Sequence, residues 1–226
     1  MHRSSWKILI ALACLVGFSL FPSADGQAEP YVAIQGGYVF PKDLYSVQGK
    51  GLNTGARFTN LSVDNTYIYG ARAGYVFADP KESGVGFEFE VNNSSPVVNQ
   101  QATVSSRVGP ILVNGNRLRL TTTALNVTIR TSRIGRFQPY GGVGPAVFFA
   151  KDSSPVGSHG FGQNATLGLN AFAGVRFFLR DRISLFGEYK YNLAKLHFEN
   201  FFGTTESGAR FNYSANILLA GLAYHF

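Results

Sequence analysis

The sequence predicts an all-β protein, an eight-stranded antiparallel up-and-down transmembrane β-barrel. Three observations lead to this fold class. Apolar residues alternate with small or polar ones at a period of two, as in a strand with one apolar face. These stretches exceed the ~5–6 residues usual in soluble proteins and match the ~9–11 that a tilted membrane-spanning strand needs. Long and short connections also alternate along the chain.

Composition excludes several other classes of protein. Of 226 residues, 15% are charged, 14% are aromatic and 26 are Gly, while Cys occurs once. A single Cys excludes a disulfide scaffold or a Cys-ligated zinc site, and 45% hydrophobic residues exclude a disordered chain. No run of ~20 apolar residues follows the N-terminal segment, which argues against a helical membrane protein.

Residues 1–26 have the organisation of a cleaved secretory signal peptide. Arg3 and Lys7 flank the start, the apolar run ILIALACLVGFSLF follows at 8–21, and small residues come next in PSADGQA. The apolar run is too short to span a bilayer comfortably. We expect cleavage near Gly26, with Ala24 and Ala28 as alternatives, and a mature barrel domain at 27–226.

Alternation and turn residues together define the expected strands. They span residues 31–40, 66–77, 84–93, 117–130, 138–150, 165–179, 182–199 and 209–226. Three of them, 66–77, 84–93 and 165–179, alternate most clearly. In 66–77, for example, Tyr67 and Tyr69 fall on one face and Arg72 on the other. We expect the apolar face to be turned toward lipid, with aromatic residues near the strand ends.

The connections indicate which membrane the barrel occupies. The short ones are ADPKES, TSRIGRF and RD, and the long ones lie near 41–65, 94–116, 151–164 and 200–208. Long loops on one rim and short turns on the other, with an even number of strands, are typical of bacterial outer-membrane barrels. The sequence therefore predicts a protein of the Gram-negative outer membrane, with its long loops outside.

The polar phase of the strands places charged side chains in the lumen. The expected ionic network comprises Arg72, Glu88, Glu90, Arg176, Glu188 and Lys190. An eight-stranded barrel is only wide enough for side chains to fill it, so these charges must pair. We expect a plugged interior in which inward glycines such as Gly74 and Gly174 make room for long charged side chains. A permeation path, or catalytic carboxylates at Glu88 and Glu90, is the competing interpretation.

The sequence contains no motif for catalysis, a cofactor or a metal. P-loop, GxSxG, HExxH and Rossmann patterns are absent, and GGVG at 141–144 lacks a following helix. His159, His197 and His225 fall on different rims, and we expect them to be exposed or interfacial. The nearest approach to a lipid-hydrolase site combines His197, Glu199 and Ser207, without the H-x-S arrangement of such enzymes. We therefore expect no enzyme activity, cofactor or metal.

Basic residues concentrate at two short turns, in Arg130, Arg133, Arg136, Arg180 and Arg182. On the periplasmic side they could contact anionic lipid headgroups. Basic residues of the long loops could likewise meet lipopolysaccharide phosphates, so outer-membrane lipids are expected partners. The basic residues form no contiguous run, and export argues against nucleic acid as a ligand.

The C-terminal residues carry the most specific signal. The chain ends in NILLAGLAYHF, with Leu222, Tyr224 and Phe226 in one phase. Together with QPYGGVGPAVFF at 138–149 and AFAGVRFFLRDRISLFGEYKYN at 171–192, this ending resembles the OmpA/OmpX-like small barrels, or "porin family", of the outer membrane. The resemblance implies that these three residues form the signal read by the barrel-assembly machinery.

Such barrels serve several roles on one scaffold, so the resemblance is weak for function. We expect a monomeric, non-enzymatic barrel that acts in envelope structure or in surface interaction through its loops. A narrow channel for small or hydrophobic solutes is one alternative. An outer-membrane lipid-modifying enzyme is the other.

Overall fold

The structure is a computed structural model that describes residues 28–43, 45–51, 57–58, 62–99, 101–105, 109–113, 116–152, 164–199 and 207–226. The expected signal peptide at 1–26 lies outside the described residues. In the described parts of the chain, every regular element is a strand. None of these parts forms a helix long and apolar enough to cross a membrane.

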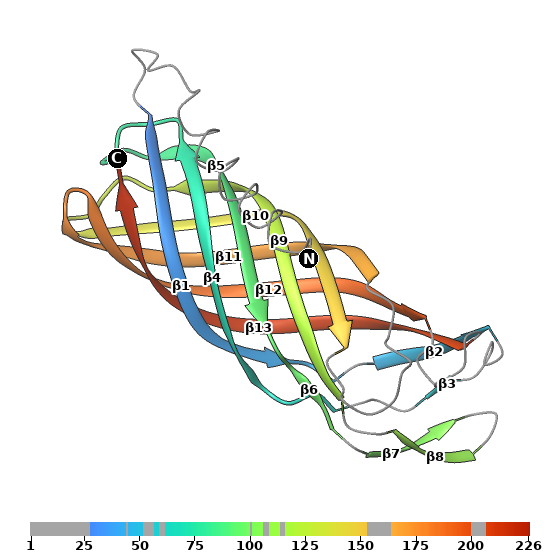
Figure 1. Cartoon of the computed structure of the whole chain (residues 1–226). Helices are drawn as coiled ribbons and strands as arrows, with labels where there is room; N and C mark the ends of the chain where they lie inside the picture. The colour runs from blue at the N-terminus through green and yellow to red at the C-terminus, as the bar shows by residue number, and fades with distance from the viewer. Residues whose placement is uncertain are drawn as a thin grey trace, which may run out of the picture.

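Eight long strands form the wall of a closed barrel (Figure 1). They are β1 (Glu29–Pro41), β4 (Thr66–Val76), β5 (Gly84–Ser94), β9 (Asn116–Arg130), β10 (Phe137–Asp152), β11 (Asn164–Arg180), β12 (Ile183–Glu199) and β13 (Ser207–His225). Each pairs antiparallel with the next, and β13 pairs back with β1 from Tyr31↔His225 to Pro41↔Ala215. The predicted up-and-down barrel is confirmed, and no predicted strand end differs from the observed one by more than two residues.

The long connections contain short strands that the sequence pattern does not predict. These are β2 (Tyr45–Gly51), β3 (Arg57–Phe58), β6 (Val97–Val98), β7 (Gln101–Ser105) and β8 (Gly109–Val113). β2 pairs with the far end of β13, and β7 and β8 form a hairpin joined to β2 through β3. The long connections near 41–65 and 94–116 therefore contain short strands that extend the sheet. These strands are too short for alternation to distinguish them from polar loop sequence.

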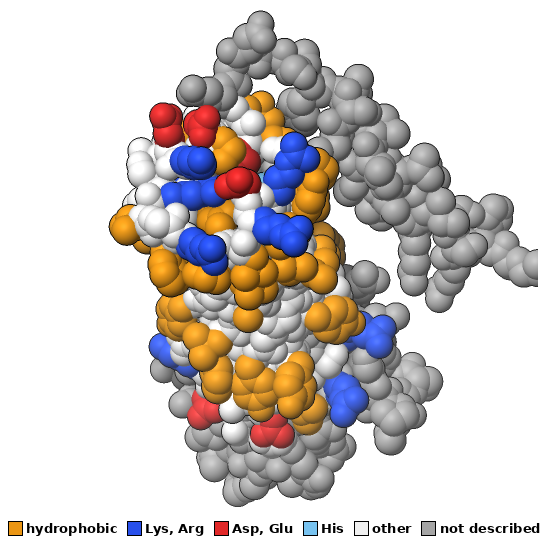
Figure 2. Space-filling model, turned by 90° about the vertical axis from the view of Figure 1, so that its left-hand side faces the viewer, with side chains coloured by type: hydrophobic (Ala, Val, Ile, Leu, Met, Phe, Trp, Pro, Cys, Tyr) orange, Lys and Arg blue, Asp and Glu red, His pale blue; other side chains and the backbone are white. Residues whose placement is uncertain are grey.

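The two faces of the wall differ as the alternation predicts. Outward side chains are apolar and exposed, for example Ile34, Tyr67, Phe87, Leu125 and Leu167. In the space-filling view, bands of hydrophobic side chains lie below a cap of Lys and Arg with a few carboxylates (Figure 2). Ladder pairing satisfies the backbone groups of the wall internally, so such a face can contact lipid.

Backbone hydrogen bonds tie the short turns together at the periplasmic end. The Arg133 amide donates to the Lys81 carbonyl at 3.0 Å, and the Phe178 amide donates to the Arg136 carbonyl at 2.8 Å. Gly135 adopts a φ of 63°, a conformation that glycine reaches without strain, and reverses the chain between β9 and β10. The side chains of three separate turns are thus held close to one another.

Candidate functional site

The barrel interior is centred on Arg72 of β4. Its Nη1 and Nη2 donate to the two oxygens of Glu188 on β12 at 2.7 and 3.0 Å. Nη1 also lies 3.3 Å from Glu88 Oε1, and Nε donates to Gln35 Oε1 at 2.5 Å. All four residues are buried. Because β4 and β12 are not neighbours in the sheet, the Arg72–Glu188 pair spans the lumen.

Lys190 extends the network toward the extracellular end. Its Nζ lies 2.5 Å from Glu90 and 3.4 Å from Glu188, and its side chain is completely buried. Asn170 Nδ2 donates to Glu90 Oε1 at 3.1 Å and to Asn126 Oδ1 at 2.9 Å. Each carboxylate thus has a cation or a hydrogen-bond donor, as burial of a charge requires.

Arg176, the sixth expected member, is buried but forms no ion pair among the described residues. Its guanidinium instead lies between two tyrosine rings, 4.5 Å from the Tyr31 centroid and 4.6 Å from the Tyr140 centroid. The Tyr31 hydroxyl donates to Glu88 at 2.6 Å and the Tyr140 hydroxyl donates to Glu188 at 2.8 Å. The expectation of three directly paired acids and bases is therefore wrong for Arg176, because aromatic rings separate it from the carboxylates.

Two of the inward glycines, Gly74 and Gly174, make room for tyrosine rings. A Cβ at Gly74 would overlap the Tyr31 ring, and one at Gly174 would lie 2.6 Å from the Gly187 carbonyl oxygen and 3.0 Å from Tyr140 Cε1. The expectation that these glycines accommodate long charged side chains holds only indirectly. They accommodate the tyrosines that in turn hold Arg176 and the carboxylates.

A second polar cluster, not predicted from the sequence, closes the periplasmic end. Glu29 of β1 forms an ion pair with Arg130 of β9, and its other carboxylate oxygen lies against the His225 ring of β13. Ser184 Oγ and His225 Nε2 share a hydrogen bond of 2.8 Å. Two expectations are corrected here, because His225 is buried rather than exposed, and Arg130 points inward rather than lining the basic rim.

Ser184, His225 and Glu29 have the order of a nucleophile, base and acid, but not the working geometry. His225 Nδ1 contacts Glu29 Oε1 closely without the alignment of a hydrogen bond. Ser184 has no exposed surface, so no substrate reaches its Oγ in this structure. Nucleophilic catalysis requires both an oriented base and access to the nucleophile. The cluster instead holds β1, β12 and β13 together near the barrel seam.

Other sequence-based candidates contribute little. The described residues contain no cluster of His, Cys, Asp and Glu that could hold a metal. His159 lies outside the described residues, as do the side chains of His197, Glu199 and Ser207. The proposed assembly residues Leu222, Tyr224 and Phe226 all point outward and are exposed, with Tyr224 and Phe226 in edge-to-face contact.

These features define a small outer-membrane β-barrel: the wall is closed, its exterior is apolar, and charged side chains fill its interior. A family model for the outer membrane protein beta-barrel domain matches residues 10–226, and the chain belongs to this family. It is a protein of the Gram-negative outer membrane. No curated protein sequence matches the chain significantly.

Two solved structures show the likeness in fold. The outer membrane protein OprG from Pseudomonas aeruginosa is 14% identical, with a TM-score of 0.58 over 89% of this chain and 97% of that one. Neisserial surface protein A is 13% identical, with a TM-score of 0.51 over 87% of this chain and 97% of that one. At these identities the likeness concerns the fold alone.

Proposed function

We propose that this barrel is a non-enzymatic, monomeric envelope protein with a lumen closed by side chains, acting in envelope structure or surface interaction through its loops. The observation that carries this proposal is the network around Arg72. Residues from β1, β4, β5, β9, β10, β11 and β12 meet in it through hydrogen bonds across the lumen. Such connected, buried charges oppose the passage of solutes, because permeation would have to separate paired ions.

Conductance tests the closed lumen. The refolded protein in a planar bilayer should show no steady current, whereas Arg72→Ala and Lys190→Ala should each introduce one by opening the centre. Leu125→Ala, on the outer face, is the matched control and should stay silent. A steady wild-type current that these interior substitutions alter would instead establish the narrow channel.

Absence of enzyme activity needs its own measurement. Overexpression should leave the mass spectrum of lipid A and the phospholipid profile unchanged. A new lipid species that disappears in a Ser184→Ala variant would contradict the proposal and assign chemistry to the periplasmic cluster.

The loop role is tested by cutting back the sheet extension. Replacing residues 101–113, the β7–β8 hairpin, with a short Gly-Ser turn should leave the barrel folded, because its eight wall strands remain paired. We expect a strain that lacks the whole gene to become detergent-sensitive or to lose a surface interaction. The wild-type gene should restore the lost property. A deletion strain that matches the parent in both respects would overturn the proposed role.

A further inference from the structure

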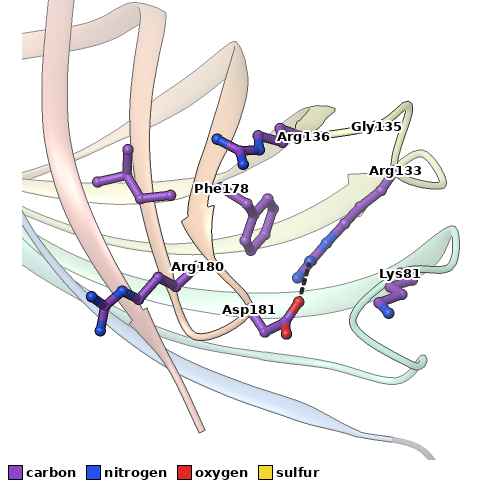
Figure 3. Close-up of a pocket in the computed structure, with 8 residues that line it drawn as sticks. Lys81, Arg133, Gly135, Arg136, Phe178, Arg180 and Asp181 are labelled. Carbon is purple, nitrogen blue, oxygen red and sulfur yellow. Dashed lines mark ion pairs between the residues drawn. The ribbon is translucent and has the colours of Figure 1, made fainter.

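A pocket of about 480 Å³ opens at the periplasmic end, between the short turns (Figure 3). Four cationic side chains, one carboxylate and two apolar side chains line it: Lys81, Arg133, Arg136, Arg180, Asp181, Phe178 and Leu179. The turn-to-turn backbone hydrogen bonds hold these groups together. The pocket therefore gathers positive charge from three separate turns into one cavity.

Arg133 is the buried member of this pocket. Its side chain is only 8% exposed, and its guanidinium carbon lies 3.3 Å from the centroid of the Phe178 ring. Nε and Nη2 have no hydrogen-bond partner, and Nη1 reaches only to 3.9 Å from Asp181 Oδ1. Burial lowers the pKa of the Arg133 guanidinium, because its charge is removed from water without a close counter-ion.

Asp181 is thus a distant counter-ion for Arg133, and the other cations that the structure describes in the pocket lack even that. Among the described residues, Lys81, Arg136 and Arg180 form no ion pair, and the carboxylate of Asp181 is 90% exposed. Cations gathered in this way repel one another, so an anion that binds among them is stabilised. Arginine in particular binds phosphate through paired N–H groups.

The position of the pocket favours a lipid as the source of the anion. Short turns face the periplasm in barrels of this kind, so the pocket lies level with the headgroups of the inner leaflet. Leu179 lines it and is also an outward, exposed residue of the wall, beside Arg180. A phospholipid whose phosphate lies in the pocket would thus place its acyl chains along the apolar face.

We propose that this pocket binds the phosphate headgroup of an anionic glycerophospholipid of the inner leaflet. Arg133 and Arg136 would contact the phosphate, Arg180 and Lys81 would contribute charge at the rim, and Leu179 would contact the upper part of an acyl chain. Binding would fix the barrel to one class of lipid at its periplasmic end.

Native mass spectrometry of the full mature protein, released from micelles, provides the test. Titration with phosphatidylglycerol should give a saturable one-to-one adduct, and phosphatidylcholine with the same chains should bind much more weakly. Arg136→Gln combined with Arg180→Gln should weaken the phosphatidylglycerol adduct about tenfold or more, given the contribution expected per basic residue near an anionic lipid. Both residues are exposed, so the double variant should fold.

Controls separate this site from general charge attraction. Arg182→Gln removes a charge beside the pocket without altering its lining, and its adduct should match wild type. Arg133→Gln should also weaken the phosphatidylglycerol adduct, provided that heat-dependent gel mobility shows the variant to be folded. Equal binding of the two lipids, or equal loss in Arg182→Gln, would overturn the proposal. Displacement of the lipid by millimolar inorganic phosphate or by a muropeptide would also overturn it, in favour of a soluble anion.

Discussion

Arg72 and Glu188 form two parallel hydrogen bonds, of 2.7 and 3.0 Å, across the interior of the barrel. They join strands that are separated in the sheet by β1 and β13 on one side and by four strands on the other. Ladder hydrogen bonds act only between neighbouring strands. This pair therefore stabilises the barrel against flattening across its interior, which hydrogen bonds between neighbouring strands do not prevent.

Breaking this pair should be costly. Glu188→Gln removes one of the carboxylates that neutralise Arg72. Arg72→Met removes the cation that these carboxylates share, so they repel one another. We expect each single variant to lose about 3–5 kcal/mol of unfolding free energy in urea titrations with lipid vesicles. The double variant Arg72→Met with Glu188→Gln should lose less than the sum. Strictly additive losses would show that the two side chains are not coupled.

The contact between Gly74 and Tyr31 gives a steric prediction. In Gly74→Ala the new methyl group would meet the Tyr31 ring, so we expect a loss of about 1–3 kcal/mol, measured by the same titration. Gly187→Ala is the matched control, since nothing lies within 4 Å of a Cβ there, and it should be nearly neutral. Adding Tyr31→Ala should remove the clash. Equal effects at Gly74 and Gly187 would refute the packing argument.

Deleting Phe226 should prevent assembly. Phe226 is 58% exposed and its ring contacts Tyr224, so its loss alters the outward C-terminal surface rather than the interior. We expect the deletion variant to be degraded in the periplasm and Phe226→Tyr to assemble normally. Fractionation with heat-dependent gel mobility measures both. Wild-type amounts of the deletion variant in the outer membrane would contradict the proposed signal.

A charge on the outer face should cost more near mid-membrane than at the rim. Leu125 of β9 pairs with Phe89 in the middle of the wall, whereas Phe77 follows β4 at the periplasmic end, and both are exposed. Leu125→Arg should lose about 2–4 kcal/mol, and Phe77→Arg about 0–1 kcal/mol. Both are compared with the corresponding Ala variants in vesicle-based unfolding. Equal losses at the two depths would argue that this face does not contact hydrocarbon.

Alternation predicted the wall well because lipid outside and a polar interior impose the same period on every strand. The same phase could have located the periplasmic cluster. His225 lies between the outward Tyr224 and Phe226, so it had to point inward, and Glu29 shares the phase of Tyr31. The strand expected at 31–40 began too late to include Glu29, and the C-terminal position of His225 suggested exposure.

The sequence predicts which side chains point into the lumen better than it predicts which of them contact one another. The sequence places Arg176 inside but does not give its depth relative to Glu88, because stagger between strands sets which side chains meet. The basic pocket was also only partly predictable from the sequence. Sequence indicated basic turns, but the burial of Arg133 against Phe178 depends on three turns meeting in space.

The wall of this barrel is not the same height all round. β4 and β5 have 11 residues each, whereas β12 has 17 and β13 has 19. Beyond its pairing with β1, β13 continues outward and pairs with β2. The extracellular mouth of the barrel wall is therefore slanted, and it is higher on the side of β12 and β13. β13 is the longest described strand of the wall, so the edge that it forms with β12 is the first place to look for surface contacts.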